Sequence, residues 1–198
     1  MATSGFSTIC WKPIWNKERE GVGLEHLLLA EGTADSVVLA FDEEHGPFRL
    51  TYRLTWDESW RLRDAELLVA TGRYTRTLRL QTDGHGLWRD GDGGAIAELD
   101  GCIDIDIWPT PFTNTFPIRR EPMATGERRA FRMAWIFGPE LTFQAQRQAY
   151  TRLADRLYLF ESLDESGFSA ELPVDDEGIV VDYPDLFRRV PTTFGENA

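Results

Sequence analysis

Strict alternation of apolar and polar residues is the feature that most restricts how this chain can fold. It is clearest over residues 48–56, and it returns over 131–137 and 168–174. In an extended strand successive side chains point to opposite faces, so an alternating segment can bury one face and leave the other in water. These three segments are therefore predicted to be half-buried strands. The apolar face of the first consists of Phe48, Leu50, Tyr52, Leu54 and Trp56.

Further strand and turn signals fill most of the remaining chain. Segments rich in strand-favouring residues lie at 36–41, 65–71, 75–82 and 156–161. Residues 23–30 fit either a short helix or a strand, and the flanking glycines favour the strand. Turns that supply positive φ occur at Asp83-Gly84, Gly91-Asp92-Gly93-Gly94 and Glu177-Gly178.

Many short strands joined by glycine-containing turns predict an all-β fold. The chain has 198 residues, 42% of them hydrophobic, which is enough for a substantial core. No Pro/Ser/Gly-rich linker and no repeat divides it. We therefore expect a single-domain antiparallel β-roll or incomplete barrel with little helix over residues 1–190, followed by a polar tail over 191–198.

Charge and composition exclude several classes of partner. The net charge of −12 repels phosphate backbones, so no nucleic acid is expected to bind. No apolar run approaches the roughly 20 residues needed for an integral membrane segment. Cys10 and Cys102 form no C-x-x-C motif, and no signal-peptide pattern is present. These features predict a cytoplasmic protein with two reduced thiols, whose oligomeric state the sequence leaves open.

The segment 102–120 joins a strand to a proline-rich turn. Its first half alternates between apolar and acidic residues, and its second half holds three of the ten prolines. Proline favours extended geometry in the residue before it, so Trp108, Thr110 and Phe116 are predicted to stay out of helix. The segment should form a strand that ends in a stiff, aromatic loop.

Several separated motifs over residues 11–189 carry a family resemblance. They are Trp11, Gly23-Leu24-Glu25, the 52–56 strand, 83–88 (DGHGLW), 99–106 (LDGCIDID), 110–120 (TPFTNTFPIRR), 146–150 and 183–187 (YPDLF). The chain resembles the putative glycolipid-binding family of bacterial proteins, formerly a domain of unknown function. The resemblance implies an antiparallel β-roll or incomplete barrel, similar to bacterial lipoprotein-carrier proteins, and an amphiphilic small-molecule ligand, a glycolipid or related lipid.

The loop itself offers the mixture of groups that a sugar needs. Thr110, Thr113 and Asn114 supply donors and acceptors beside the flat faces of Trp108 and Phe112. The alternative is a loop that satisfies its own backbone while its aromatic residues, Phe116 among them, close one end of the roll. Both interpretations stay open at this point.

Two further groups extend the candidate site. Arg119 and Arg120 could clamp a phosphate or carboxylate, but in a strand they would point to opposite faces. Gln144, Gln146, Gln148 and Tyr150 share one strand face, which would suit a hydroxyl-rich ligand if it lined a cavity. We favour an exterior position for this face, because half of each strand must face away from the core.

Asp104 and Asp106 lie two residues apart and should project from the same strand face. They could bind a cation or perform acid/base chemistry, but we favour ion pairing with Arg119 or Arg120. His26, His45 and His85 are isolated, and no nucleophile, zinc or nucleotide motif is present. No metal, cofactor or catalytic residue is therefore predicted.

The sequence thus favours a non-enzymatic binding module that holds an amphiphilic ligand in the cavity of a β-roll. The alternatives are an enzyme that uses Asp104 or Asp106 with Arg119 or Arg120, and a protein-interaction scaffold with a solid interior. The candidate ligand-binding residues are Trp108, Thr110, Phe112, Thr113, Asn114, Arg119, Arg120, Gln146 and Tyr150.

Overall fold

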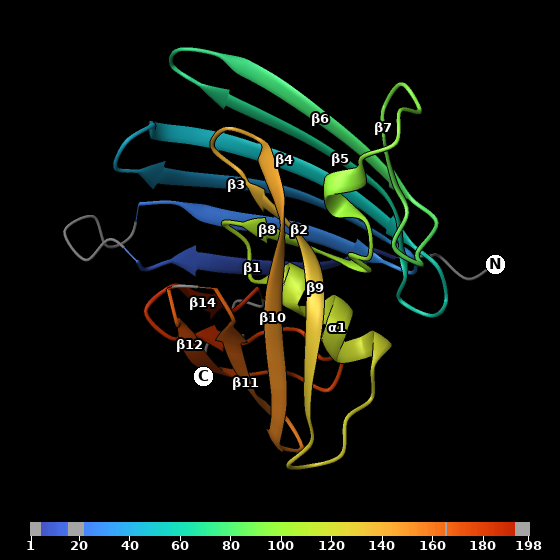
Figure 1. The fold of residues 1–198 in the computed structure, drawn as a ribbon. Coiled ribbons are helices and arrows are strands. Elements are labelled where there is room, and N and C mark those ends of the chain that lie inside the picture. The colour runs from blue at the N-terminus through green and yellow to red at the C-terminus, as the bar shows by residue number, and fades with distance from the viewer. Residues whose placement is uncertain (1–4, 16–21, 165, 193–198) are drawn as a thin grey trace, which may run out of the picture.

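The structure, a computed structural model, describes residues 5–15, 22–164 and 166–192, and its strands form two sheets (Figure 1). The larger sheet has nine strands, and each pairs with its neighbours in antiparallel fashion. In spatial order they are β13 (Asp182–Tyr183), β14 (Phe187–Val190), β1 (Ser7–Pro13), β2 (Leu24–Ala30), β3 (Thr33–Asp42), β4 (Gly46–Trp56), β5 (Leu62–Thr71), β6 (Thr75–Thr82) and β7 (Trp88–Asp90).

The smaller sheet has five strands, of which β9 and β10 run across the strands of the larger sheet in Figure 1. In spatial order they are β12 (Ser169–Pro173), β11 (Leu157–Ser162), β10 (Thr142–Ala154), β9 (Arg128–Phe137) and β8 (Asp104–Trp108). Strand β8 pairs with β9 in parallel, and the other pairs are antiparallel. The parallel pair requires a crossover, and the proline-rich segment after β8 lies in it.

That crossover contains the short 3-10 helix η3 (Phe112–Asn114) and the helix α1 (Thr115–Arg120). The expectation that Phe116 stays out of helix is therefore wrong. Pro117 lies in the first turn of α1, where a backbone N–H has no partner within the helix, so proline is tolerated there. Phe116 also packs edge-on against Trp56 at 5.4 Å between ring centroids, and this contact favours the helical turn.

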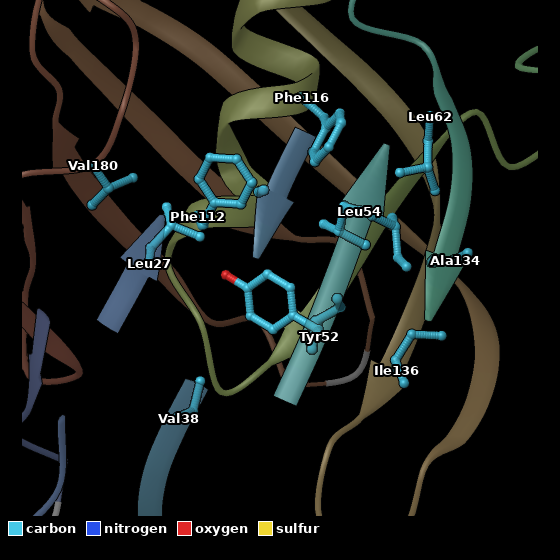
Figure 2. Close-up of a cluster of buried hydrophobic side chains, with 14 of the residues drawn as sticks. Leu27, Val38, Tyr52, Leu54, Leu62, Phe112, Phe116, Ala134, Ile136 and Val180 are labelled. Atoms are coloured by element: carbon cyan, nitrogen blue, oxygen red, sulfur yellow. The ribbon is translucent and has the colours of Figure 1, made fainter. Parts of the chain in front are cut away.

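The core lies between the two sheets. Figure 2 shows Tyr52 and Leu54 of β4 facing Ala134 and Ile136 of β9, with Phe116 beside them. Buried side chains from both sheets and from the crossover form a single cluster. The predicted face of β4 enters this cluster, as the alternation indicates. In β9 the core face consists of Ala134 and Ile136, so the expectation that the alternating residues of 131–137 form the buried face is wrong.

The prediction of an all-β fold with little helix is confirmed. Residues 24–30 form the strand β2, so the strand interpretation of this segment is correct. The single domain stays a prediction, although the common core is what it would require. Most of the predicted polar tail, residues 193–198, lies outside the described residues. Within the described ranges, no helix has the length and apolar character to cross a membrane.

Candidate ligand pocket

A pocket of about 320 Å³ lies where the smaller sheet meets β13 and β14. Its wall is mostly aromatic, and ring contacts at 6.0 to 6.3 Å between centroids link several of its members. The apolar lining residues are Ile107, Trp108, Trp135, Phe160, Phe168, Leu186 and Phe187. The polar lining residues include Asp106, Thr110, Asn114, Gln146, Gln148 and Tyr183.

Gln148 supplies the most informative polar atom of the pocket. Its side-chain Nε2 donates a 2.5 Å hydrogen bond to Oδ2 of Asp106, which directs the other end of the amide away from the carboxylate. The residue is 1% exposed, yet its Oε1 has no partner among the described residues. A buried acceptor without a partner costs about 1–3 kcal/mol. Gln148, a lining residue of the pocket, therefore carries an unused hydrogen-bond acceptor.

Asp106 forms the polar end of the pocket beside this amide. Thr113 Oγ1 donates to its Oδ1 at 3.1 Å, and the same hydroxyl accepts from the backbone N–H of Ile107 at 3.2 Å. Burial raises the pKa of Asp106, while the hydrogen bonds from Gln148 and Thr113 oppose that shift. Both partners of this carboxyl are neutral.

A second buried carboxyl lies behind the pocket wall. Glu25 of β2 is 0% exposed, and its Oε1 accepts from the hydroxyls of Tyr52 at 2.6 Å, Thr110 at 2.8 Å and Ser36 at 3.0 Å. Burial raises the pKa of Glu25 to about 7, against the opposing effect of these hydrogen bonds. Its Oε2 has no partner among the described residues. Thr110 thus connects the pocket to a buried acid.

Sequence reasoning assigned no role to Glu25, although a signal was present. Glu25, Leu27 and Leu29 alternate along β2 and all three are buried. An acid on the apolar face of a predicted strand indicates a buried carboxyl that needs partners. The shared face of Gln144, Gln146, Gln148 and Tyr150 was expected to be exterior. This is correct for the exposed Gln144 and wrong for the rest, because Gln146 and Gln148 line the pocket and Tyr150 is buried. Gln144 lies near the start of β10 and is exposed, whereas Gln146 and Gln148 share the pocket with residues of β13 and β14.

The predicted ion pair with an arginine is present for Asp104 but not for Asp106, whose partners are Thr113 and Gln148. Arg120 contacts its two oxygens through Nε at 2.9 Å and Nη2 at 2.7 Å. The carboxyl is 0% exposed and the arginine side chain 5% exposed. Burial raises the pKa of Asp104, and Arg120 opposes the shift. This fork-like pair joins β8 to the end of α1 and lies outside the aromatic pocket.

Arg119 points into a different hollow. Its guanidinium lies 5.0 Å from the ring centroid of Trp60 and donates to the carbonyl of Glu177 at 3.2 Å. The open groove around it, of about 940 Å³, is also lined by Glu31, Asp57 and Glu58. The two arginines at the end of α1 thus have separate partners.

The nine sequence-predicted ligand residues therefore divide into three groups. Trp108, Thr110, Asn114 and Gln146 line the aromatic pocket. Thr113 and Tyr150 lie directly behind it, because Thr113 binds Asp106 and the Tyr150 hydroxyl donates to Asn114 Oδ1 at 2.8 Å. Phe112, Arg119 and Arg120 lie elsewhere, Phe112 in the core and the arginines as described above.

The loop also satisfies its own backbone, as the second interpretation proposed. Thr110 Oγ1 accepts from the N–H of Phe112 at 3.1 Å, and Asn114 Nδ2 donates to the carbonyl of Pro111 at 3.0 Å. The two interpretations are thus compatible, since Thr110 and Asn114 both brace the turn and line the pocket. Within the described part of the chain, no group of three or more His, Cys, Asp or Glu residues is arranged to hold a metal ion.

The fold and the pocket together define an all-β roll of two sheets with an aromatic cavity at their junction. A family model described as "Putative glycolipid-binding" matches residues 12–189, and the chain belongs to this family, formerly DUF1089. The chain is similar to the crystal structure of a DUF1089 family protein from Pseudomonas aeruginosa, with 49% identity and a TM-score of 0.84. The match covers 86% of this chain and 93% of that one. No curated protein matches the chain.

Proposed function

We propose that this chain binds an amphiphilic ligand, a glycolipid or a related lipid, with its polar head in the aromatic pocket. The observation that carries the proposal is the unpartnered, buried Oε1 of Gln148 in a wall of aromatic rings. A ligand hydroxyl would satisfy this acceptor, while flat rings such as Trp108 and Trp135 would cover the apolar faces of a sugar or the start of an alkyl chain.

The size of the pocket limits how much of the ligand it can enclose. Its volume of about 320 Å³ is at the lower end of the roughly 300–1,000 Å³ typical of ligand sites. The core between the sheets is filled by side chains such as Trp11 and Leu27, which are fully buried. The pocket therefore takes a headgroup and a short length of chain, and a longer acyl chain extends out of it.

The arrangement of charges gives less support to the enzyme alternative. Asp104 is neutralised by Arg120, and the hydrogen-bond partners of Asp106 are Thr113 and Gln148, so neither carboxyl is joined to an arginine that faces the pocket. The cavity also argues against a scaffold with a solid interior.

We place this binding in the bacterial cytoplasm, and the free thiols Cys10 and Cys102 support a reducing compartment.

Native mass spectrometry and a titration with octyl β-glucoside test the proposal. The purified protein should carry or take up an amphiphile, and intrinsic fluorescence should report it because Trp108 and Trp135 line the pocket. Gln148→Leu should weaken the affinity about tenfold, since it removes the free acceptor. Gln144→Leu, on an exposed position of the same strand, is the matched control and should bind like the wild type. A protein that comes off clean and ignores alkyl probes would refute the proposal.

A further inference from the structure

Two polar side chains of the pocket wall, Thr110 and Gln148, point their hydrogens at carboxyl groups of the protein. Two donors of the pocket wall are taken by carboxyls, those of the fully buried Glu25 and the partly buried Asp106. The hydroxyl of Thr110 donates to Glu25, and an amide N–H of Gln148 donates to Asp106. Because these hydrogens point at carboxyls, the neighbouring oxygen lone pairs are what remains for a ligand.

Gln148 Oε1 is an acceptor without a partner in the described part of the chain, and its orientation is fixed by a neighbouring carboxyl. Gln148 Oε1 has no partner among the described residues and is enclosed by the protein. Its orientation is set by Asp106, because an acceptor-only carboxylate requires the nitrogen end of the amide. The hydroxyl of Thr113 also donates to Asp106, so that carboxyl is held by two donors and fixes the amide firmly.

The charges around the pocket point the same way. Asp106 and Asp164 line it, and no Lys, Arg or His does so among the described residues. The two arginines that could have met an anion are directed to Asp104 and to the Trp60 groove. Gln146 and Tyr183 can both donate and accept, so they favour neither sign. An anionic head would lose its water on entering the pocket, would be repelled by the carboxyls, and would find no cation among the described lining residues to pair with, so its binding is disfavoured.

We propose that the pocket selects an uncharged polyhydroxyl headgroup, a neutral sugar, and rejects phosphate, sulfate and carboxylate heads. This inference rests on the proposed function and narrows its ligand class. A sugar hydroxyl donates to Gln148 Oε1 and accepts from the amide of Gln146, and its apolar face lies on an aromatic ring of the wall. An ammonium head could donate to Gln148 Oε1 but has no lone pair with which to accept from the Gln146 amide, whereas a sugar hydroxyl does both.

The test compares three probes with the same alkyl chain, octyl β-glucoside, octyl phosphate and octylammonium, each below its micelle-forming concentration. Calorimetry on the wild-type protein should give the glucoside an affinity at least about tenfold above that of either charged probe. Equal affinities, or tighter binding of the phosphate or the amine, would overturn the headgroup inference and leave amphiphile binding standing. Absence of binding by all three would overturn the proposed function and this inference with it.

Asp106→Asn tests the cause of the selectivity. The introduced amide nitrogen can donate to the Gln148 oxygen, which turns the Gln148 amide so that its nitrogen faces the pocket. The affinity ratio of glucoside to phosphate should then fall about tenfold or more. Asp35→Asn, an identical change at an exposed position of β3, is the control for lost charge and should leave the ratio unchanged. An unchanged ratio in a folded Asp106→Asn protein would contradict the role assigned to the carboxyl.

Discussion

Thr110 Oγ1 donates a 2.8 Å hydrogen bond to Glu25 Oε1, and this contact ties the wall of the aromatic pocket to a strand of the opposite sheet. Glu25 is fully buried and has no cationic partner among its hydrogen bonds. The same carboxyl accepts a hydrogen bond from the hydroxyl of Tyr52, which Figure 2 shows pointing into the middle of the core. One ionisable group therefore affects both the stability of the core and the order of the pocket wall.

Glu25→Gln should change how stability depends on pH. Burial raises the pKa of Glu25 from 4.5 to about 7, so the folded state holds a proton that the unfolded state releases between these values. Its contribution to stability is full below about pH 4.5 and is lost as pH rises through about 7. Over this window the unfolding free energy of the variant should gain roughly 3 kcal/mol relative to the wild type. Urea denaturation at a series of pH values measures this, and parallel curves for the two proteins would contradict it.

Arg120→Met should destabilise the protein strongly. It leaves the Asp104 carboxyl buried without its charged partner, which typically costs about 3–5 kcal/mol. The double variant Asp104→Leu/Arg120→Met should recover much of the loss, because no unpaired charge remains. Chemical denaturation provides the comparison. The matched control is Arg128→Met, which breaks a more exposed ion pair with Glu161 and should cost less than about 1 kcal/mol. Equal effects of the two single changes would contradict the structural role of the buried pair.

His45 should stabilise the fold at acidic pH. It contacts Asp42 at 2.7 Å and Glu140 at 3.4 Å, so it joins the turn after β3 to the turn after β9. The hydrogen bond with Asp42 is the largest cause that raises its pKa above 6.5. The stabilisation is full below about pH 6.5 and is lost as pH rises through the folded-state value. His45→Gln should therefore lower the melting temperature more at pH 5.5 than at pH 9, with His85→Gln as an exposed control. A loss independent of pH would argue against the charged form.

Phe112 and Trp108 should differ in what their removal costs. Phe112 is fully buried and packs near Trp56, at 6.1 Å between ring centroids, so Phe112→Ala should cost about 3–5 kcal/mol of stability. Trp108 is half-buried and lines the pocket, so Trp108→Ala should mainly weaken binding of an alkyl glucoside. Thermal melts and calorimetry on both variants separate the two effects. A Trp108→Ala protein with unchanged affinity would remove that side chain from the site.

Local pattern accounts for the strands that the sequence predicts and for the buried face of β4. In β9 it gives the strand but not the core face, because Ala134 and Ile136 enter the core and the alternating aromatic residues lie on the opposite face. Residues 48–56 and 131–137 lie in β4 and β9, as predicted. These strands could be predicted because the alternation of side chains is a property of each segment alone. The helix at Thr115–Arg120 could not be derived in this way, since the contact of Phe116 with Trp56 is a tertiary interaction that opposes the bias of the prolines. The sequence pattern also could not show that Gln146 and Gln148 of β10 line a pocket. Which face of a strand is covered depends on elements far along the chain, here β13 and β14.

Part of the candidate site was visible because it lies in one short segment. Trp108, Thr110 and Asn114 fall within seven residues, and their mixture of rings and hydrogen-bonding groups is a local property. The partnership of Asp106 with Gln148 spans 42 residues and no spacing rule connects them. The partners of the two arginines could not be predicted either, because they depend on the helix α1. In it Arg120 faces Asp104 and Arg119 faces Trp60.

The most direct test of the central claim is a crystal structure of the protein with a short-chain alkyl glucoside. We expect the sugar between Trp108 and the polar end of the pocket, with one hydroxyl at roughly 2.5–3.0 Å from Gln148 Oε1. A glucoside bound in the groove beside Trp60 and Arg119, with the aromatic pocket left empty, would contradict the claim.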